Sequence, residues 1–164
     1  MKRAAGFTYI ALLIGVAIIG IGLAATGVQW ATVQKREKER QLLFIGGEFR
    51  RAIAQYAEKS GNPVTRYPFS LEDLLKDPRY PTTQRYLRKI YVDPMTGTKD
   101  WGLIKGPDGE IYGIFSQSDE VPLKMARFDL ADSQFEGRVK YSEWVFMALR
   151  TTAQSSMPIT TTKK

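Results

Sequence analysis

The strongest constraint in this sequence is an apolar stretch near its beginning, GFTYIALLIGVAIIGIGLAATGV at residues 6–28. Between Phe7 and Val28 the stretch contains no charged residue and no proline, and its most polar groups are threonine hydroxyls. A helix of this length spans about 33 Å, close to the roughly 30 Å hydrocarbon core of a bilayer. Only a helix pairs all of its own backbone polar groups in that environment. Residues 7–28 are therefore predicted to form a membrane-spanning helix.

The residues in front of this stretch, Met1–Gly6 (MKRAAG), form a short basic leader that ends in glycine. A secretory signal peptide has a shorter apolar run, followed by a small-residue cleavage site. The small residues of Leu23–Thr26 leave that alternative open. A lipoprotein anchor is excluded because the chain contains no cysteine.

The junction Gly6-Phe7-Thr8-Tyr9-Ile10-Ala11-Leu12-Leu13 closely resembles the class III leader of type IV pilin-like proteins. In that family a basic leader ends in Gly and is followed by Phe-Thr-Leu-Ile-Glu-Leu and an apolar helix. The resemblance implies that a prepilin peptidase cleaves between Gly6 and Phe7 and that the new Phe7 amine is methylated. The alternative is an ordinary signal anchor with a chance Gly-Phe pair.

Ala11 departs from the family pattern, which has Glu at the fifth position of the mature chain. In related filaments this carboxylate faces the charged N-terminus of a neighbour, and such a partner offsets part of the cost of a charge in an apolar core. The family's exception is a subunit at the filament tip, and the other interpretation is a weakly bound peripheral subunit. Of the two, we favour a minor component, and the sequence leaves open whether the subunit is major or minor.

Two pairs of small residues, Ala11 with Gly15 and Gly20 with Ala24, lie four positions apart in the apolar stretch. Such spacing permits close contact between membrane helices, so these four residues are candidate assembly positions. The same pairs are frequent in any membrane helix, which leaves an incidental origin open.

The orientation of the predicted membrane helix depends on the resemblance. Basic residues lie on both sides of it, and a bare count would place the C-terminal side in the cytoplasm. The family places the leader in the cytoplasm and the domain outside. The prediction is thus a single-pass protein of a bacterial inner membrane, with its C-terminal domain in the periplasm.

The helix is predicted to continue through residues 29–60, because the first proline of the chain is Pro63. Its apolar residues recur every three or four positions, which defines a stripe that needs a cover. Gly46 and Gly47 weaken this helix and indicate either close packing or a bend. The stripe residues are Leu42, Ile45, Phe49, Ile53 and Tyr56.

Residues 61–150 are predicted to form a small periplasmic α+β domain, and the polar tail 151–164 to be disordered. Together with the long helix this is the lollipop architecture of pilin-like proteins. Tyr67-Pro68-Phe69-Ser70-Leu71 and Asp93-Pro94-Met95-Thr96-Gly97 resemble elements of type II secretion pseudopilins. The predicted elements are a capped helix at 70–75, a helical turn at 82–89, strands at 90–92, 101–105, 110–115 and 140–149, and a hairpin turn at 106–109.

The sequence contains no recognisable catalytic motif. It has no histidine and no cysteine, which removes His-based triads and almost all zinc sites. We therefore predict a protein that is not an enzyme and has no cofactor. Asp119 and Glu120 are candidate calcium ligands, because major pseudopilins bind calcium in a loop after their hairpin, but calcium takes six to eight oxygens. The alternative for this pair is a solvated turn.

The resemblance implies a structural pseudopilin of a short periplasmic filament that helps export folded proteins by type II secretion. Its implied partners are other pseudopilins, the prepilin peptidase, the inner-membrane secretion platform and membrane lipid. The net charge of +7 is spread along the chain, so specific nucleic-acid binding is not expected. The alternatives are a minor type IV pilin of a surface filament for adhesion, motility or DNA uptake, and an anchored periplasmic domain unrelated to filaments.

Overall fold

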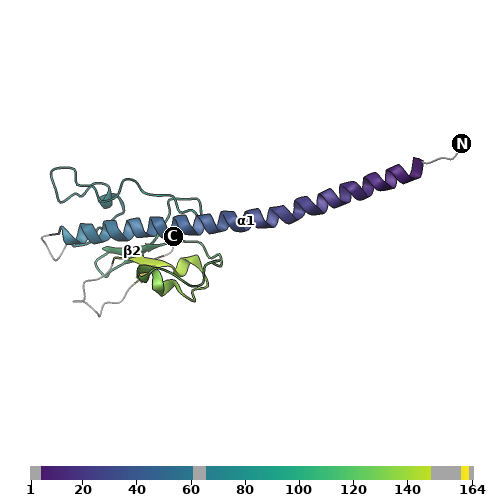
Figure 1. Ribbon diagram of the computed structural model, residues 1–164. Helices are drawn as coiled ribbons and strands as arrows, with labels where there is room; N and C mark the ends of the chain where they lie inside the picture. Colours follow the sequence, from purple (N-terminus) through teal and green to yellow (C-terminus); the bar gives the residue numbers. More distant parts are fainter. Residues whose placement is uncertain (1–4, 61–65, 149–159, 163–164) are drawn as a thin grey trace. The chain divides into compact units, whose positions relative to one another are not determined.

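The computed structural model describes residues 5–60, 66–148 and 160–162, and for residues 5–8, 20–29 and 160–162 it describes the backbone alone. These parts form one long helix and a small antiparallel sheet, which confirms the predicted α+β class (Figure 1). The chain divides into two compact units, Met1–Glu37 and Lys38–Lys164.

Helix α1 covers Ala5–Glu58 and so contains both of the stretches in which the sequence predicts helix. It has no internal proline, so each residue after the first turn can donate its backbone N–H to the helical ladder. Over the residues whose side chains the structure describes, no helix is both long and apolar enough to cross a membrane. The predicted membrane span over residues 7–28 is therefore not supported by the described residues, and the side chains of 20–28 lie outside them.

The sheet belongs to the second unit, and its strand order is β3-β2-β1-β4. All neighbouring strands are antiparallel. The predicted hairpin is confirmed, and its turn uses Gly109 at a φ of +85°, a conformation that favours glycine. The strands are β1 (Gly102–Lys105), β2 (Ile111–Phe115), β3 (Val145–Met147) and β4 (Thr160–Thr162).

Several predicted elements require correction. The run 140–149 contains a 3-10 helix, η3 (Tyr141–Glu143), before a strand of only three residues. The regions 82–89 and 90–92 form neither helix nor strand and adopt bends and irregular backbone. In the tail predicted to be disordered, Thr160–Thr162 pair with β1, since three threonines suit an edge strand. The remaining tail residues, 151–159 and 163–164, lie outside the described part.

The predicted capped helix at 70–75 is shorter than expected. Ser70 and Asp73 exchange reciprocal hydrogen bonds: Ser70 N donates to Asp73 Oδ2 over 3.0 Å and Asp73 N donates to Ser70 Oγ over 3.3 Å. This confirms the capping pair, but only one 3-10 turn follows, η1 (Glu72–Leu74). Leu74 is fully buried and fixes the turn on the core.

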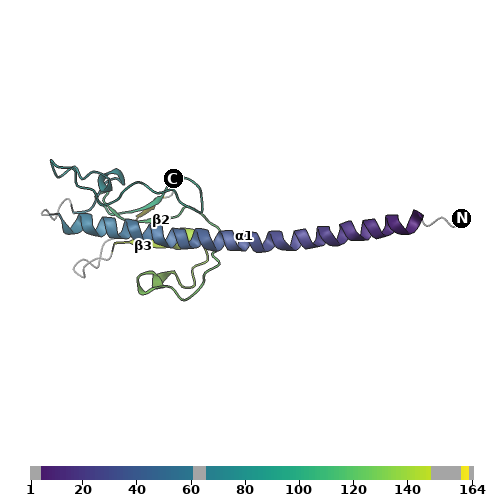
Figure 2. The ribbon, with the colours of Figure 1, turned by 45° about the horizontal axis from the view of Figure 1, so that its top comes forward.

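The apolar stripe of α1 within the second unit is the centre of the core. Leu42, Phe49, Ile53 and Tyr56 are each at most 2% exposed, as the helical periodicity predicts. In both ribbon views the segment around 66–100 lies on one side of this part of α1, and the green to yellow segment that contains β3 lies on the other (Figures 1 and 2). This part of the helix therefore organises the domain around itself.

The two adjacent glycines of α1 have different surroundings. A Cβ atom added at Gly46 would lie 2.3 Å from the ring of Phe146, a residue of β3 that is fully buried. A Cβ atom at Gly47 would meet nothing within 4 Å. Gly46 is thus required for close packing between α1 and β3. Of the two interpretations of the Gly46-Gly47 pair, close packing or a bend, the structure supports close packing at Gly46.

The C-terminal end of α1 is held by a buried ion pair. Asp77 is fully buried and accepts hydrogen bonds from Arg79, with Nη2 at 2.7 Å from Oδ2. Arg79 also donates to the carbonyl oxygen of Tyr56 over 2.9 Å, and its guanidinium stacks on the Tyr56 ring at 3.6 Å. A cation at this end of a helix satisfies one of the last free carbonyls and matches the helix dipole.

Candidate assembly surface

The first unit presents apolar side chains to the surroundings along α1. A helix that is hydrophobic on all sides is normally covered by other apolar groups, in a protein core or a bilayer. Here the large apolar side chains of this stretch are between 51% and 64% exposed. They are Tyr9, Ile10, Leu12, Leu13, Ile14, Val16, Ile18 and Ile19.

The predicted processing and assembly residues lie along the same helix. The bond between Gly6 and Phe7 lies in the first turn of α1, where backbone N–H groups have no helical partner. Ala11 is exposed, and a Cβ atom at Gly15 would meet nothing within 4 Å, so both are open to a neighbouring helix. The side chain of Ala24 and the surroundings of Gly20 lie outside the described part.

In the second unit a buried carboxylate of α1 fixes a distant loop. Glu39 is only 4% exposed, and its Oε1 accepts hydrogen bonds from the backbone N–H groups of Leu123 and Lys124 over 2.5 and 3.2 Å. The hydroxyl of Tyr141 donates to the same oxygen over 2.8 Å. Burial raises the pKa of Tyr141, so this hydroxyl remains protonated and keeps its role as a donor.

Glu39 is a residue that the prediction of functional positions missed. Its signal was present, since it lies three residues before Leu42 and so falls on the apolar stripe of the helix. A charged residue on such a stripe indicates a buried partner, because an unpaired carboxylate there would be costly. The partner itself could not be predicted, as Leu123 and Tyr141 are far away in sequence.

Substitution of Glu39 by glutamine is expected to lower the free energy of unfolding by about 1–2 kcal/mol, because a neutral amide oxygen accepts these hydrogen bonds less strongly. Tyr141→Phe removes one donor and should cost about 1 kcal/mol. Urea unfolding measures both values. Hydrogen exchange at the amides of Leu123 and Lys124 should be faster in Glu39→Gln and not in Tyr141→Phe, because only the first variant weakens the acceptor of these two amides. Unchanged exchange in Glu39→Gln would contradict the role assigned to this carboxylate.

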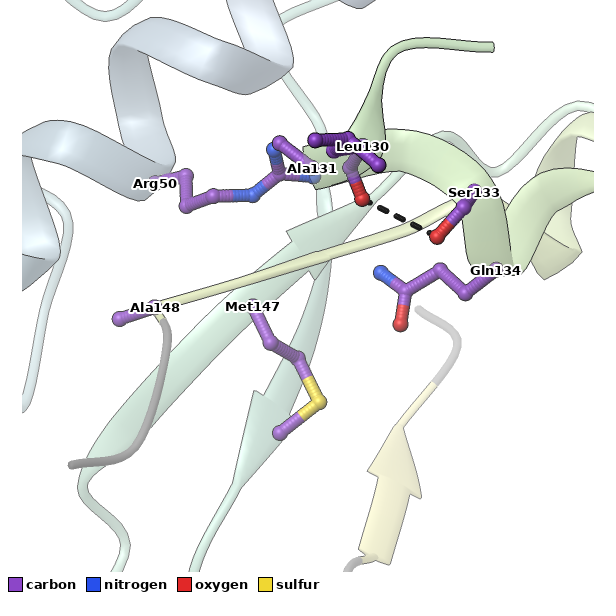
Figure 3. Close-up of a pocket in the computed structure, with 7 residues that line it drawn as sticks. All are labelled: Arg50, Leu130, Ala131, Ser133, Gln134, Met147 and Ala148. Atoms are coloured by element: carbon purple, nitrogen blue, oxygen red, sulfur yellow. Dashed lines mark hydrogen bonds between the residues drawn. The ribbon is translucent and has the colours of Figure 1, made fainter. Parts of the chain in front are cut away.

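A shallow hollow lies between α1, the 3-10 helix η2 (Leu130–Phe135) and β3, and Figure 3 shows its lining residues. Its polar groups are engaged within the domain: Arg50 pairs with Asp132 over 2.7 Å, and Gln134 Nε2 donates to the Val145 carbonyl over 2.9 Å. Ser133 donates to the Leu130 carbonyl, the contact drawn in Figure 3. These contacts attach η2 to the helix and the sheet edge.

The loop proposed for calcium contains a lysine contact instead of a cluster of carboxylates. Asp119 Oδ1 accepts a hydrogen bond from Ser142 Oγ over 2.9 Å and lies 3.9 Å from Lys140 Nζ. Over the part of the chain that the structure describes, no three acidic, histidine or cysteine side chains are grouped as metal ligands would be. These contacts test neither of the two interpretations of Asp119 and Glu120, the calcium site and the solvated turn.

Comparison of the chain with protein-family models, with curated proteins and with solved structures gives no match.

Proposed function

We propose that this protein is a structural subunit of a pilus-like filament, of the pseudopilin type that serves type II secretion. The observation that supports this most is the run of exposed apolar side chains on α1 between Tyr9 and Ile19, which follows a basic leader and a Gly6-Phe7 junction. A helix of this kind is stable only when lipid or other apolar helices cover it.

In this proposal residues 7–28 span the inner membrane, and the domain lies in the periplasm. A prepilin peptidase removes the leader, and the subunit then packs against other pseudopilins through its apolar helix, with the inner-membrane secretion platform as the assembly partner. The role needs no catalytic group and no cofactor. Ala11 in place of the family's Glu indicates a minor subunit, because it cannot offer a carboxylate to a neighbour's N-terminus.

The proposal is tested by determining the N-terminal residue and the mass of the protein purified from the membranes of its own host. We expect a chain that begins at N-methylated Phe7. Gly6→Ala should be the matched variant that retains the leader, because it changes only the residue before the cleaved bond. A chain that begins at Met1, or near Ala25 after signal-peptide cleavage, would refute the proposal and leave an anchored or exported domain.

A further inference from the structure

One edge of strand β1 is covered by a strand of only three residues, β4 (Thr160–Thr162). The antiparallel register runs from Lys105 opposite Thr160 to Leu103 opposite Thr162. Among the described residues no other strand lies on this side of β1. Without β4, this edge of β1 would present unpaired backbone N–H and C=O groups, which are the usual template for the addition of a strand from another chain.

The chemistry of β4 makes it a weak cover. A strand of three residues makes few ladder hydrogen bonds, and the backbone entropy lost on ordering each residue is similar in size to the gain from one such bond. Cross-strand side-chain pairs must therefore supply the surplus. Three threonines offer no charge to Lys105 and little apolar surface to Leu103 and Ile104. We therefore expect β4 to detach while the rest of the sheet stays folded.

The backbone groups of β1 face its two neighbouring strands in alternation. Gly106 N donates to the Glu110 carbonyl across the hairpin over 2.8 Å, so Gly106 faces β2. Alternation along an antiparallel strand then turns the backbone groups of Ile104 to β2, and those of Leu103 and Lys105 to β4. Detachment of β4 would thus expose two amides of β1 and leave the one between them paired.

The residues of β1 define the strand that would fit this edge better than β4. Lys105 is partly exposed and lies opposite Thr160, so an acidic residue in that place would add an opposite charge. Ile104 is only 3% exposed and Leu103 is partly buried, so β-branched apolar residues opposite them would bury more surface than threonine does. In the direction of β4, the better strand has an acidic residue followed by two β-branched apolar residues.

We propose that the free edge of β1 is a docking site for an extended segment of another protein that carries an acidic residue followed by two β-branched apolar residues. Strand β4 is then a weak, exchangeable occupant of the same edge. The incoming segment pairs antiparallel with β1 from Lys105 to Leu103, so that its main chain provides affinity and its side chains provide specificity. This inference goes beyond the proposed filament function and does not depend on it.

Hydrogen exchange in the full-length chain, purified in detergent micelles, tests whether β4 detaches. We expect the amides of Leu103 and Lys105 to exchange at least about tenfold faster than the amide of Ile104, which β2 protects. Thr162→Pro removes an N–H that faces β1 and should accelerate these two amides further. Thr161→Pro is the matched control, because its N–H faces away from β1 and proline is tolerated there on an edge strand. Equal exchange of the three β1 amides in the wild type would overturn the proposal.

The chemistry of the edge is tested within the chain itself. The triple variant Thr160→Glu, Thr161→Ile and Thr162→Val should slow exchange at Leu103 and Lys105 by at least about tenfold, because the improved strand is held at high effective concentration. The reversed order, with Val, Ile and Glu at the same three positions, is the matched control, since it places the acidic residue opposite Leu103. Equal slowing by both orders would show that the edge does not select this chemistry and would overturn the proposal.

Docking from outside the chain is tested with a synthetic nine-residue peptide that has Glu-Ile-Val at its centre and serine and threonine on both sides. We expect it to bind the Thr162→Pro chain at least about tenfold more tightly than the wild type, because β4 no longer competes for the edge. A peptide with the central order reversed should bind at least about tenfold more weakly. Failure of the first peptide to protect Leu103 and Lys105 in the Thr162→Pro chain would overturn the proposal. A dimer that forms by exchange of β4 between chains, and that the peptide does not dissociate, would identify a second copy as the occupant and would also overturn it.

Discussion

Replacement of Gly46 by alanine is expected to lower the free energy of unfolding by about 2 kcal/mol. The added methyl group would lie 2.3–2.4 Å from three ring atoms of Phe146, so the ring or the helix must move. Phe146 is fully buried and packs against Phe135 with ring centroids 5.0 Å apart, which leaves it little freedom. Overpacking of this kind costs about 1–3 kcal/mol and outweighs the gain in helix propensity. Urea unfolding of the full chain measures the loss.

Gly47→Ala is the matched control for this experiment, since the same substitution one residue later meets open space. It should raise the free energy of unfolding by about 0.5–1 kcal/mol. Phe146→Leu should partly rescue Gly46→Ala, because the smaller side chain makes room, and the double variant would then be more stable than the two single effects predict. Equal effects of alanine at positions 46 and 47 would refute the packing argument.

The sequence predicted the parts of the fold that depend on local pattern. The helical periodicity from Leu42 to Tyr56 and the Gly-Pro-Asp-Gly turn were sufficient for the second half of α1 and for the β1–β2 hairpin. The third strand was less predictable, because aromatic residues favour strands locally but tertiary contacts override that preference. Tyr141 and Trp144 are buried and their rings contact each other. Tyr141 begins η3 and Trp144 follows its last residue, so neither belongs to a strand.

The candidate surface was predictable only where it depends on residue type. The apolar stretch and the Gly6-Phe7 junction are visible in the sequence, whereas the difference between Gly46 and Gly47 depends on where Phe146 lies. Likewise, the three donors to Glu39 come from residues more than eighty positions away. No local pattern specifies such contacts, because they arise from the way the domain closes around α1.

Substitution of Asp77 by asparagine is expected to lower the free energy of unfolding by about 3 kcal/mol, because it leaves a half-buried guanidinium without its counter-charge. Asp77 is fully buried, while Arg79 is 18% exposed at its side chain and also supports the last turn of α1 through Tyr56. Tyr86 donates its hydroxyl to Asp77 Oδ2 over 2.9 Å, and burial raises the pKa of Tyr86 to about 12, so this hydrogen bond persists at neutral pH. The expected loss of stability in Asp77→Asn therefore comes mainly from the ion pair with Arg79.

The control is Asp119→Asn, which removes an exposed contact with Lys140 at 3.9 Å and should change the stability by less than about 0.5 kcal/mol.

The pH dependence of the stability provides a second test of the Asp77–Arg79 ion pair. Burial opposes ionisation of Asp77, but hydrogen bonds from Arg79 and Tyr86 outweigh it and hold its pKa below the ordinary value of 3.8. The unfolded chain therefore binds the proton first as the pH falls. The contribution of Asp77 is complete above 3.8 and is lost below it, as the pH passes through the folded-state pKa. Urea unfolding at about pH 7 and about pH 3 should show the wild type and Asp77→Asn converging in acid, and a constant difference would contradict the ion-pair account.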